Sequence, residues 1–311
     1  MGLNKWLGIA LVSTMVLFSI VDLSVGDEIQ TIPYEEGSID VFFCPRDGCG
    51  HILGGLLDQA SDIECALFDL GLENIEDKLR DKGADVITDI RSHSDYGLKL
   101  SRPGYMHNKF CILNNHITIT GSFNPTENGD KKNNNNLLVI DSRMIAQNYL
   151  DEFYELKSKK QTRTRYPKIN LSGTIIENYF CPEDDCEGRI HDLLLSAVYV
   201  RFMTFSFTSE KIGDALLVPD SKGVFEKSQA GSQYSQYSRL NSFIDLRKDT
   251  NPNMMHHKVF ILDNQTVITG STNPTQSGFH KNDENVVIIH DPEIAKHYMA
   301  EFDLIWGQSL E

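Results

Sequence analysis

The chain contains two copies of one pattern, and this duplication limits the folds open to it more than any other feature. Cys44 lies in the run VFFCP, and Cys181 lies in the run NYFCP, 137 residues later. A second pair of matching segments begins at His107 and His256, 149 residues apart. The additional residues of the second copy fall near 228–238, where a run rich in Ser, Gln and Tyr is typical of an inserted loop. The 311 residues therefore accommodate two versions of one structural unit.

Both copies are predicted to combine helices with strands. Residues 51–60 and 188–197 carry apolar side chains at spacings of three and four, which predicts helices. Continuous apolar runs, which are typical of strands covered on both faces, lie at 137–140, 260–262 and 286–289. Each copy is expected to close with a helix, at 143–156 and at 292–306. The predicted fold class is therefore α/β, with helices layered on a sheet in each copy.

The first 26 residues form a segment of a different kind. Lys5 precedes an uncharged run at 6–21, and small residues follow at 24–26, as in an export signal. The run is shorter than the roughly 20 apolar residues of a membrane span, although an uncleaved anchor remains the alternative. The predicted segments are a signal peptide or N-terminal membrane anchor at 1–26, a first repeat at 27–165 and a second repeat at 166–311. We therefore expect an extracytoplasmic protein, secreted or anchored to the membrane, that is active as a monomer.

Six cysteines fit such an exported chain, because disulfides persist outside the cytoplasm. Four of them occur in two matching Cys-Pro-x-Asp-x-Cys motifs, which pair Cys44 with Cys49 and Cys181 with Cys186. We expect each motif to form a local disulfide, since a zinc site would need the two motifs to converge and the short loops give no reason that they should. Cys65 and Cys111 lie in apolar runs and are expected to be buried thiols.

The negative net charge of the chain excludes a protein whose whole surface attracts polyanions. The formal net charge is −15, with a sequence pI near 5.1. A linker at 156–168 is the local exception, because it contains no acidic residue and carries Lys157, Lys159, Lys160, Arg163, Arg165 and Lys168. The linker is either a solvated surface or a contact for phosphate groups, and the sequence leaves both possibilities open.

The clearest chemical signal is a doubled His-x-Lys motif. His107 and Lys109 in the first copy correspond to His256 and Lys258 in the second, and each pair is followed at the same spacing by Gly-Ser-x-Asn-Pro-Thr. From His107 to Thr126 the two copies agree at 12 of 20 positions. Residues two apart on a strand point to the same side, so each motif presents an imidazole and an ammonium together. This combination suits phosphate binding and proton transfer.

Two such motifs predict a complete catalytic site. One neutral imidazole can attack phosphorus while the other, protonated, gives its proton to the leaving oxygen. The ammonium groups can stabilise the charge on the other phosphate oxygens. Hydroxyl and amide donors for those oxygens are expected from Ser122, Asn124, Ser271 and Asn273. The predicted mechanism uses no metal ion and no cofactor.

The paired motifs resemble those of the phospholipase D superfamily, whose signature is His-x-Lys, four residues, Asp, six residues, Gly-Ser-x-Asn. The resemblance covers nearly the whole chain after the first 26 residues. It implies two α/β lobes with mixed β-sheets flanked by helices, a pseudo-twofold axis, and one active site shared at the interface. It also implies a metal-independent phosphodiesterase that forms a phosphohistidine intermediate, with His107 as the nucleophile and His256 as the acid.

The first copy departs from the signature at two positions. Asn114 occupies the place of the aspartate that Asp263 retains, and because the family's aspartate is mainly structural we expect the amide to be tolerated. Glu284, the carboxylate expected to orient a histidine, lies 28 residues after His256, whereas Asn135 lies 28 residues after His107. This spacing predicts that Glu284 favours the imidazolium form of His256 and that Asn135 leaves His107 neutral. The alternatives are His256 as the nucleophile or a site that has lost its activity.

The motif does not distinguish nucleic acid from phospholipid as the substrate. We expect a nuclease-type enzyme, because the compact repeats resemble the small bacterial and archaeal nuclease-like members, and the loop with Tyr234, Tyr237 and Arg239 could hold a strand. The alternatives are a phospholipase D or cardiolipin hydrolase, associated with a membrane through the N-terminal segment, and a non-catalytic phosphate-binding module of the same fold. A nuclease predicts a groove bordered by Lys and Arg, a lipase predicts an apolar rim, and the binding module requires that His107 and His256 do not face one phosphate.

Overall fold

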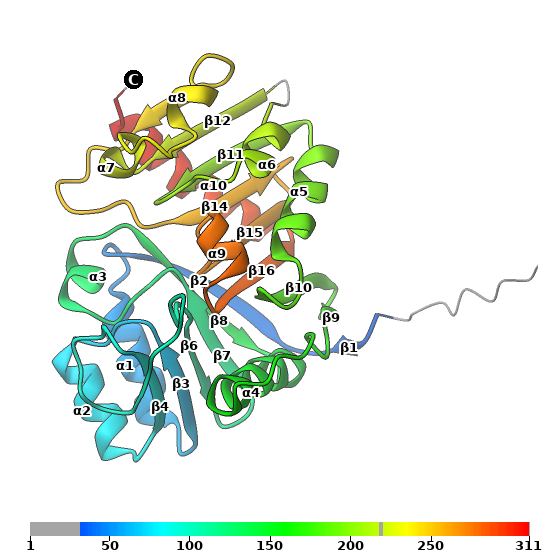
Figure 1. Ribbon diagram of the computed structural model, residues 1–311. Coiled ribbons are helices and arrows are strands. Elements are labelled where there is room, and N and C mark those ends of the chain that lie inside the picture. Colours follow the sequence, from blue (N-terminus) through cyan, green and yellow to red (C-terminus); the bar gives the residue numbers. More distant parts are fainter. Residues whose placement is uncertain (1–31, 218–219, 311) are drawn as a thin grey trace, which may run out of the picture. The chain divides into compact units, whose positions relative to one another are not determined.

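Two mixed β-sheets flanked by helices form the computed structural model, which describes residues 32–217 and 220–310 (Figure 1). The first sheet has the order β2 (Ser38–Cys44), β8 (Asn135–Asp141), β7 (Ile117–Gly121), β6 (Lys109–Leu113), β3 (Ile63–Leu67), β4 (Asp85–Asp89) and β5 (Leu98–Leu100). The second has the order β1 (Tyr34–Glu35), β9 (Lys168–Leu171), β10 (Thr174–Cys181), β16 (Glu284–His290), β15 (Thr266–Gly270), β14 (Lys258–Leu262), β11 (Tyr199–Thr204), β12 (Asp220–Phe225) and β13 (Asp245–Lys248). From β10 onward the second order repeats the first, which confirms the predicted α/β fold and its duplication.

The helices cover both faces of each sheet, which explains the continuous apolar runs of the strands. One core lies under α1 (Cys49–Gln59) and α2 (Glu73–Asp81), and its counterpart lies under α5 (Cys186–Ser196) and α6 (Glu210–Ala215). A third core joins the two lobes and contains α4 (Arg143–Ser158) and α10 (Pro292–Gln308). The remaining helices are α3 (Glu127–Lys131), α7 (Lys227–Ala230), α8 (Tyr237–Leu240) and α9 (Gln276–His280).

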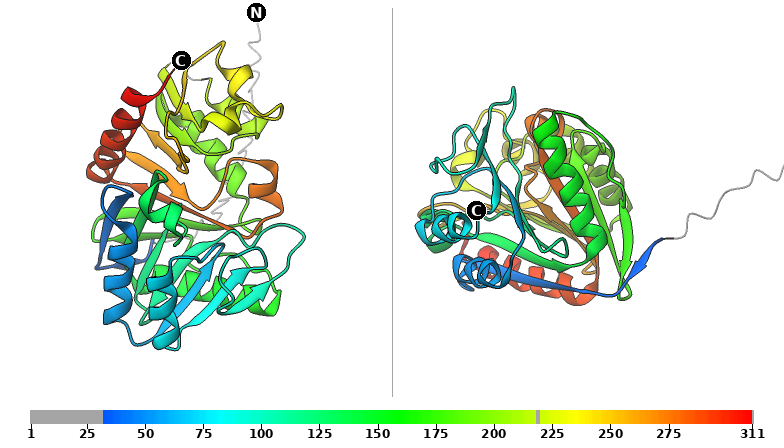
Figure 2. Two further views of the ribbon diagram at one scale, coloured as in Figure 1. Left: turned by 90° about the vertical axis from the view of Figure 1, so that its left-hand side faces the viewer. Right: turned by 90° about the horizontal axis from the view of Figure 1, so that it is seen from below.

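The contacts between the lobes come in reciprocal pairs. Helix α4 packs on β6 and β7 of its own lobe and on β10 of the other, while α10 packs on β14 and β15 and on β2 of the other lobe (Figure 2). The backbone N–H of His107 donates to the carbonyl of Asp283 at 2.9 Å, and that of His256 donates to the carbonyl of Asn134 at 2.9 Å. Each lobe thus makes the same contacts to the other lobe, and reciprocal contacts of this kind define a twofold relation. An approximate twofold axis therefore passes between the two His-x-Lys motifs.

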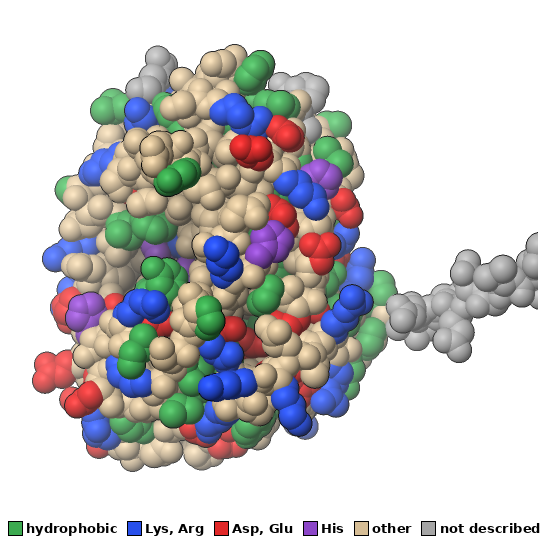
Figure 3. All heavy atoms as spheres, in the orientation of Figure 1, with side chains coloured by type: hydrophobic (Ala, Val, Ile, Leu, Met, Phe, Trp, Pro, Cys, Tyr) green, Lys and Arg blue, Asp and Glu red, His purple; other side chains and the backbone are tan. Residues whose placement is uncertain are grey.

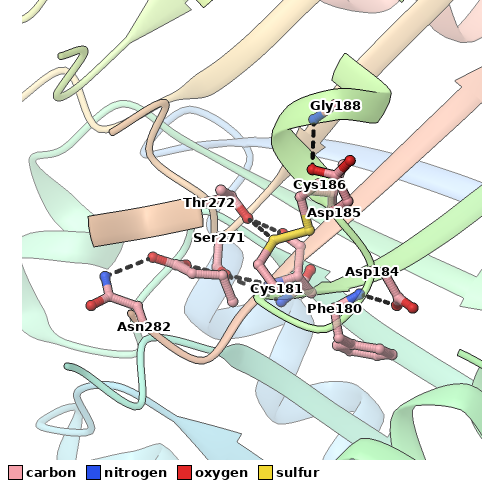
Figure 4. The surroundings of a disulfide bond; sticks show 12 residues. Phe180, Cys181, Asp184, Asp185, Cys186, Gly188, Ser271, Thr272 and Asn282 are labelled. Atoms are coloured by element: carbon pink, nitrogen blue, oxygen red, sulfur yellow. Dashed lines mark hydrogen bonds between the residues drawn. A yellow bond between two sulfur atoms is a disulfide. The ribbon is translucent and has the colours of Figure 1, made fainter. Parts of the chain in front are cut away.

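The two local disulfides are formed as the sequence predicts. Cys44 is bonded to Cys49 and Cys181 to Cys186, and each bond closes the turn between a first strand and the helix that follows it. Figure 4 shows the second of these turns, where the Asp184 carboxylate accepts from the backbone N–H of Phe180 at 2.9 Å. These turns fix α1 and α5 against the sheets, and the strand register places Cys44 opposite Asn135 and Cys181 opposite Glu284.

The expectation that Cys65 and Cys111 are buried thiols is wrong, because the two residues form a third disulfide. Cys65 lies on β3 and Cys111 on β6, and the antiparallel register of these strands places the two residues directly opposite each other. The sequence shows that both residues lie in apolar runs, but it does not show which strands pair or in which register. All cysteines of the described residues are therefore oxidised.

Removing the Cys65–Cys111 bond is expected to destabilise the fold more than removing a local one. The bond closes a loop of 46 residues, whereas Cys44–Cys49 closes one of 5. Chain entropy predicts a loss of about 4 kcal/mol for the long loop and about 2 kcal/mol for the short one. Urea unfolding of Cys65→Ala/Cys111→Ala and Cys44→Ala/Cys49→Ala measures the difference. Equal losses would show that loop length does not set the effect.

The basic linker makes contacts within the protein. Lys157 pairs with Asp85, Arg165 pairs with Asp151 at 2.7 Å, and Lys168 lies 3.5 Å from Glu177. The linker residues that remain exposed without an ion pair among the described residues are Lys159, Lys160 and Arg163. Lys157, Arg165 and Lys168 of the linker therefore form ion pairs within the protein.

The predicted N-terminal segment at 1–26 lies outside the described residues and stays a prediction. Within the part of the chain that the structure describes, every helix is too short or too polar to cross a bilayer.

Candidate active site

Both His-x-Lys motifs lie where a strand begins beside the twofold axis. His107 lies two residues before Lys109, the first residue of β6, and His256 lies two residues before Lys258, the first residue of β14. The Lys109 ammonium donates to the carbonyl of His107 at 2.5 Å, and the Lys258 ammonium donates to the carbonyl of His256 at 2.7 Å. All four side chains are buried. The strands therefore bring the two imidazoles and the two ammonium groups together.

A cleft of about 630 Å³ contains both histidines. Figure 3 shows a hollow on this face with a histidine (purple) inside it. The cleft is lined mainly by amide, hydroxyl and aromatic side chains: Phe68, Asp69, Tyr105, Asn124, Thr126, Asn128, Asn133, Phe205, Ser206, Thr208, Gln229, Tyr234, Met254, Asn273, Thr275, Gln276, Ser277 and Asn282. His107 and His256 thus face one space. The non-catalytic binding module required the opposite, namely that the two histidines do not face one phosphate.

Each histidine is oriented by a residue of the other lobe. His107 Nδ1 lies 2.8 Å from Glu284 Oε2, and His256 Nδ1 lies 2.8 Å from Asn135 Oδ1. The spacing in the sequence predicted the opposite pairing, with Glu284 beside His256 and Asn135 beside His107, and that prediction is wrong. The physical reason is the backbone pairing across the axis, because the residue before Glu284 accepts from the N–H of His107 and the residue before Asn135 accepts from the N–H of His256.

The corrected pairing still distinguishes the two imidazoles. The Glu284 carboxylate accepts a hydrogen bond from the Nδ1–H group of His107, which leaves the Nε2 lone pair of that ring free and stabilises any positive charge that forms on it. His256 Nδ1 faces two neutral acceptors, the Asn135 amide oxygen and the carbonyl of Ser122 at 3.1 Å. The two rings therefore differ in the partner of Nδ1, which is a carboxylate for His107 and neutral acceptors for His256.

Burial controls the protonation of this cluster. Burial, followed by the charges of Lys109 and Lys258, lowers the pKa of both His107 and His256 well below the ordinary value. Burial also lowers the pKa of Lys109 to about 7 and raises the pKa of Glu284 to about 7. A bound phosphate diester would place a negative charge beside Lys109 and Lys258. This charge would favour the protonated forms of both lysines.

Two phenylalanines support the catalytic groups, and motif-based reasoning did not assign them to the site. The Phe68 ring lies 4.8 Å from the His107 ring and 5.0 Å from Lys109 Nζ. The Phe205 ring lies 5.0 Å from the His256 ring and 5.1 Å from Lys258 Nζ. A ring face attracts an ammonium where water is excluded. The available signal was the duplication itself, because Phe68 and Phe205 occupy equivalent places in the two copies.

The serine hydroxyls of the two Gly-Ser-x-Asn turns contact the orienting residues, whereas the sequence predicted that they bind phosphate. The hydroxyls of Ser122 and Ser271 are fully buried and bind the orienting residues, at 3.2 Å from Asn135 Oδ1 and 2.6 Å from Glu284 Oε2. We therefore correct the prediction that these hydroxyls bind phosphate and assign them to positioning. Asn124 and Asn273 do line the cleft, where their amides remain candidates for phosphate binding.

The inserted loop offers one aromatic ring to the cleft. Tyr234 is exposed and lines the cleft. Tyr237 is buried in the core of the second lobe, and Arg239 lies 2.6 Å from Asp214, so the structure contradicts the expectation that all three contact a strand. Among residues 32–217 and 220–310, no three His, Cys, Asp or Glu side chains converge as ligands for a metal ion.

Asn114 and Asp263 have the same structural role. Asn114 Oδ1 accepts from the backbone N–H of Ser61 at 2.9 Å, and Asp263 Oδ1 accepts from that of Tyr199 at 2.9 Å. Both residues adopt the left-handed conformation, with φ of 53°, which Asn and Asp tolerate better than most residues. Because one side-chain oxygen makes these bonds, an amide replaces the carboxylate without losing them.

Asp263→Asn is therefore expected to keep the phosphodiesterase rate within about twofold, with a stability change of about 0.5 kcal/mol or less. Asp263→Ala removes the acceptor and is expected to cost about 1–2 kcal/mol. Urea unfolding and initial rates on both variants test this assignment. A large loss of activity in Asp263→Asn with unchanged stability would contradict it.

Comparison with known proteins identifies the family. The family described as cardiolipin synthase, PLD-like domain, matches residues 71–157 and 190–306. Mitochondrial cardiolipin hydrolase from Homo sapiens is 34% identical over 122 residues, which cover 37% of this chain and 48% of that protein. The hydrolase from Xenopus laevis is 34% identical over 176 residues, which cover 51% of this chain and 84% of that protein. The chain thus spans about half the length of the human relative.

A solved structure shares the fold over most of the chain. Phosphatidylserine synthase from Haemophilus influenzae Rd KW20 matches with a TM-score of 0.64 and 12% identity, covering 87% of each chain. Two α/β lobes with paired His-x-Lys motifs in one cleft define a protein with the phospholipase D fold. The family match covers more than half of the chain, and the chain belongs to the phospholipase D superfamily.

Proposed function

We propose that the protein is a metal-independent phosphodiesterase that cleaves single-stranded nucleic acid through a phosphohistidine intermediate. The observation that carries the proposal is the pair of imidazoles that line one cleft, His107 with a carboxylate on Nδ1 and His256 with neutral acceptors. Nucleophilic attack and proton transfer require two such groups on the two sides of one phosphorus.

The two steps follow from this geometry. Nε2 of His107 attacks phosphorus, the bond to the leaving oxygen breaks, and His256 gives its proton to that oxygen. His256, now neutral, then takes a proton from water, and the resulting oxygen attacks the phosphohistidine and releases His107. Lys109 and Lys258 stabilise the negative charge on the remaining phosphate oxygens in both steps. The Glu284 carboxylate stabilises His107 while it carries the phosphoryl group.

The lining of the cleft supports nucleic acid as the substrate. Amides from both lobes can hydrogen-bond to base edges, and Tyr105 and Tyr234 offer exposed rings on which bases can stack. Among the described residues that line the cleft, Met254 is the one with an aliphatic side chain, and the remaining large apolar side chains are aromatic. No lysine or arginine is among the described residues of the lining, so a border of basic residues would lie outside the cleft itself.

Phospholipid is the second candidate substrate. The relatives from Homo sapiens and Xenopus laevis are named cardiolipin hydrolases, and the family description names cardiolipin synthase. Both substrates present a phosphodiester to the same two histidines, so the chemistry proposed above applies to either. The composition of the lining is the observation that favours nucleic acid.

We also propose that the protein acts outside the cytoplasm as a monomer, secreted or held at a membrane by residues 1–26. The three disulfides support this location, because such bonds persist in oxidising compartments. The twofold-related lobes support action as a monomer, because one chain supplies both histidines.

The proposal is tested by incubating the full chain in EDTA with labelled single-stranded DNA, single-stranded RNA, cardiolipin-containing vesicles and bis(p-nitrophenyl) phosphate. Cleavage of DNA or RNA supports the proposal. Cleavage confined to cardiolipin overturns the nucleic-acid assignment and keeps the chemistry. Cleavage that needs added metal ions, or cleavage of no substrate including bis(p-nitrophenyl) phosphate, overturns the proposed mechanism.

A further inference from the structure

Two lysines occupy equivalent positions at the edge of the cleft. Lys132 directly follows α3, and Lys281 directly follows α9. Both are exposed, and among residues 32–217 and 220–310 neither forms an ion pair. Exposed lysines that have no acidic partner keep their charge available for an anion.

Each lysine is held between two residues that line the cleft. The backbone N–H of Lys132 donates to the carbonyl of Asn128 at 3.1 Å, and the next residue along the chain is Asn133. Asn128 and Asn133 both line the cleft. The ammonium group of Lys132 is therefore within side-chain reach of the cleft edge formed by α3.

The second lobe repeats this arrangement. The backbone N–H of Lys281 donates to the carbonyl of Ser277 at 3.0 Å, and the next residue is Asn282. Ser277 and Asn282 both line the cleft. Because the approximate twofold axis passes between the two histidines, Lys132 and Lys281 lie on opposite sides of the phosphate that the histidines would attack.

We infer that the cleft binds a polynucleotide strand that continues past the scissile phosphate in both directions, with Lys132 and Lys281 each binding a neighbouring phosphate. This inference rests on the proposed function. It also provides the basic border that the lining of the cleft lacks. In a protein with a net charge of −15, such local cations are needed to hold a polyanion.

The surface beside Lys132 has room for the continuing strand. A polar depression of about 430 Å³ is lined by Lys132 together with Asn134, Asn251 and Asn253. Asn251 Nδ2 donates to the carbonyl of Lys132 at 3.0 Å, so the loop from the second lobe is fixed against the end of α3. Amide groups at this place can donate to phosphate oxygens of the strand.

The test compares Lys132→Gln, Lys281→Gln and the double variant in the full chain with Lys296→Gln, which removes the same charge from an exposed lysine on α10. The substrates are a single-stranded 20-nucleotide DNA and bis(p-nitrophenyl) phosphate, which has no neighbouring phosphate. For DNA, the double variant is expected to raise KM about tenfold and to reduce the slope of log affinity against log salt concentration by about 1.4, since each contact with a single strand contributes about 0.7. Cleavage of bis(p-nitrophenyl) phosphate is expected to stay unchanged.

Each outcome bears on a different statement. An unchanged KM and salt slope in the double variant, with DNA cleaved normally, overturns the inference and leaves the proposed function intact. Equal effects in Lys296→Gln also overturn it, because general charge would then explain the result. If the unsubstituted chain cleaves bis(p-nitrophenyl) phosphate but no DNA or RNA, the proposed function fails and the inference fails with it.

Discussion

His107→Ala is expected to abolish phosphodiester cleavage, with a loss of about 10⁴-fold or more in kcat/KM, because in the proposed mechanism it removes the atom that attacks phosphorus. His256→Ala is expected to be as damaging on DNA or RNA, whose leaving alkoxide needs a proton. On bis(p-nitrophenyl) phosphate the leaving group needs no proton, so the first step continues in His256→Ala. The second step still lacks its base, and phosphohistidine accumulates on His107.

A rapid-quench experiment separates these roles. In His256→Ala, a burst of p-nitrophenol equal to the enzyme concentration is expected, together with an acid-labile phosphoryl group on His107. In His107→Ala, neither is expected. The reverse result, a burst in His107→Ala alone, would make His256 the nucleophile, which is the alternative that the sequence left open. Circular dichroism of both variants controls for loss of the fold.

Local features of the site could be predicted from the sequence. Residues two apart on a strand point to one side whatever the rest of the fold does, so His107 and Lys109 could be placed together from their spacing alone. Asn114 could be assigned a structural role because the second copy shows the residue that it replaces. The α/β class followed from apolar runs that the two-sided cover of each sheet explains.

Contacts between distant segments could not be predicted in the same way. Glu284 lies 177 residues from His107 in the sequence, and the spacing within one copy gave no sign that the orienting residues are exchanged between lobes. The exchange depends on two bridges across the axis, Met106 with Asp283 and Met255 with Asn134, which lie just before the strands. The Cys65–Cys111 bond depends in the same way on a strand register that the sequence does not encode locally.

The exchange makes Glu284→Gln the most informative substitution after the histidines. The glutamine keeps the size of the side chain but removes the charge that stabilises His107 when it carries the phosphoryl group. We expect kcat/KM to fall by about 10² to 10⁴-fold. In the unsubstituted enzyme Glu284 takes up a proton as the pH falls through about 7, because burial raises its pKa to that value, and the rate is expected to fall on this acidic side. Glu284→Gln is expected to lose that acidic limb, since no carboxyl group remains there to titrate.

Asn135→Asp is the matched control, because it places a carboxylate beside His256 without changing His107. The new charge is expected to raise the pKa of His256 and keep it protonated to higher pH, while the rate stays within about tenfold. The basic limb of the pH profile, to which Lys109 with its pKa of about 7 also contributes, is expected to move upward. Profiles of kcat/KM from pH 5 to 9 for both variants measure these shifts. The opposite result would be a change of the basic limb in Glu284→Gln and of the acidic limb in Asn135→Asp. Glu284 would then act on His256 and Asn135 on His107, and the cross-lobe pairing would not govern catalysis.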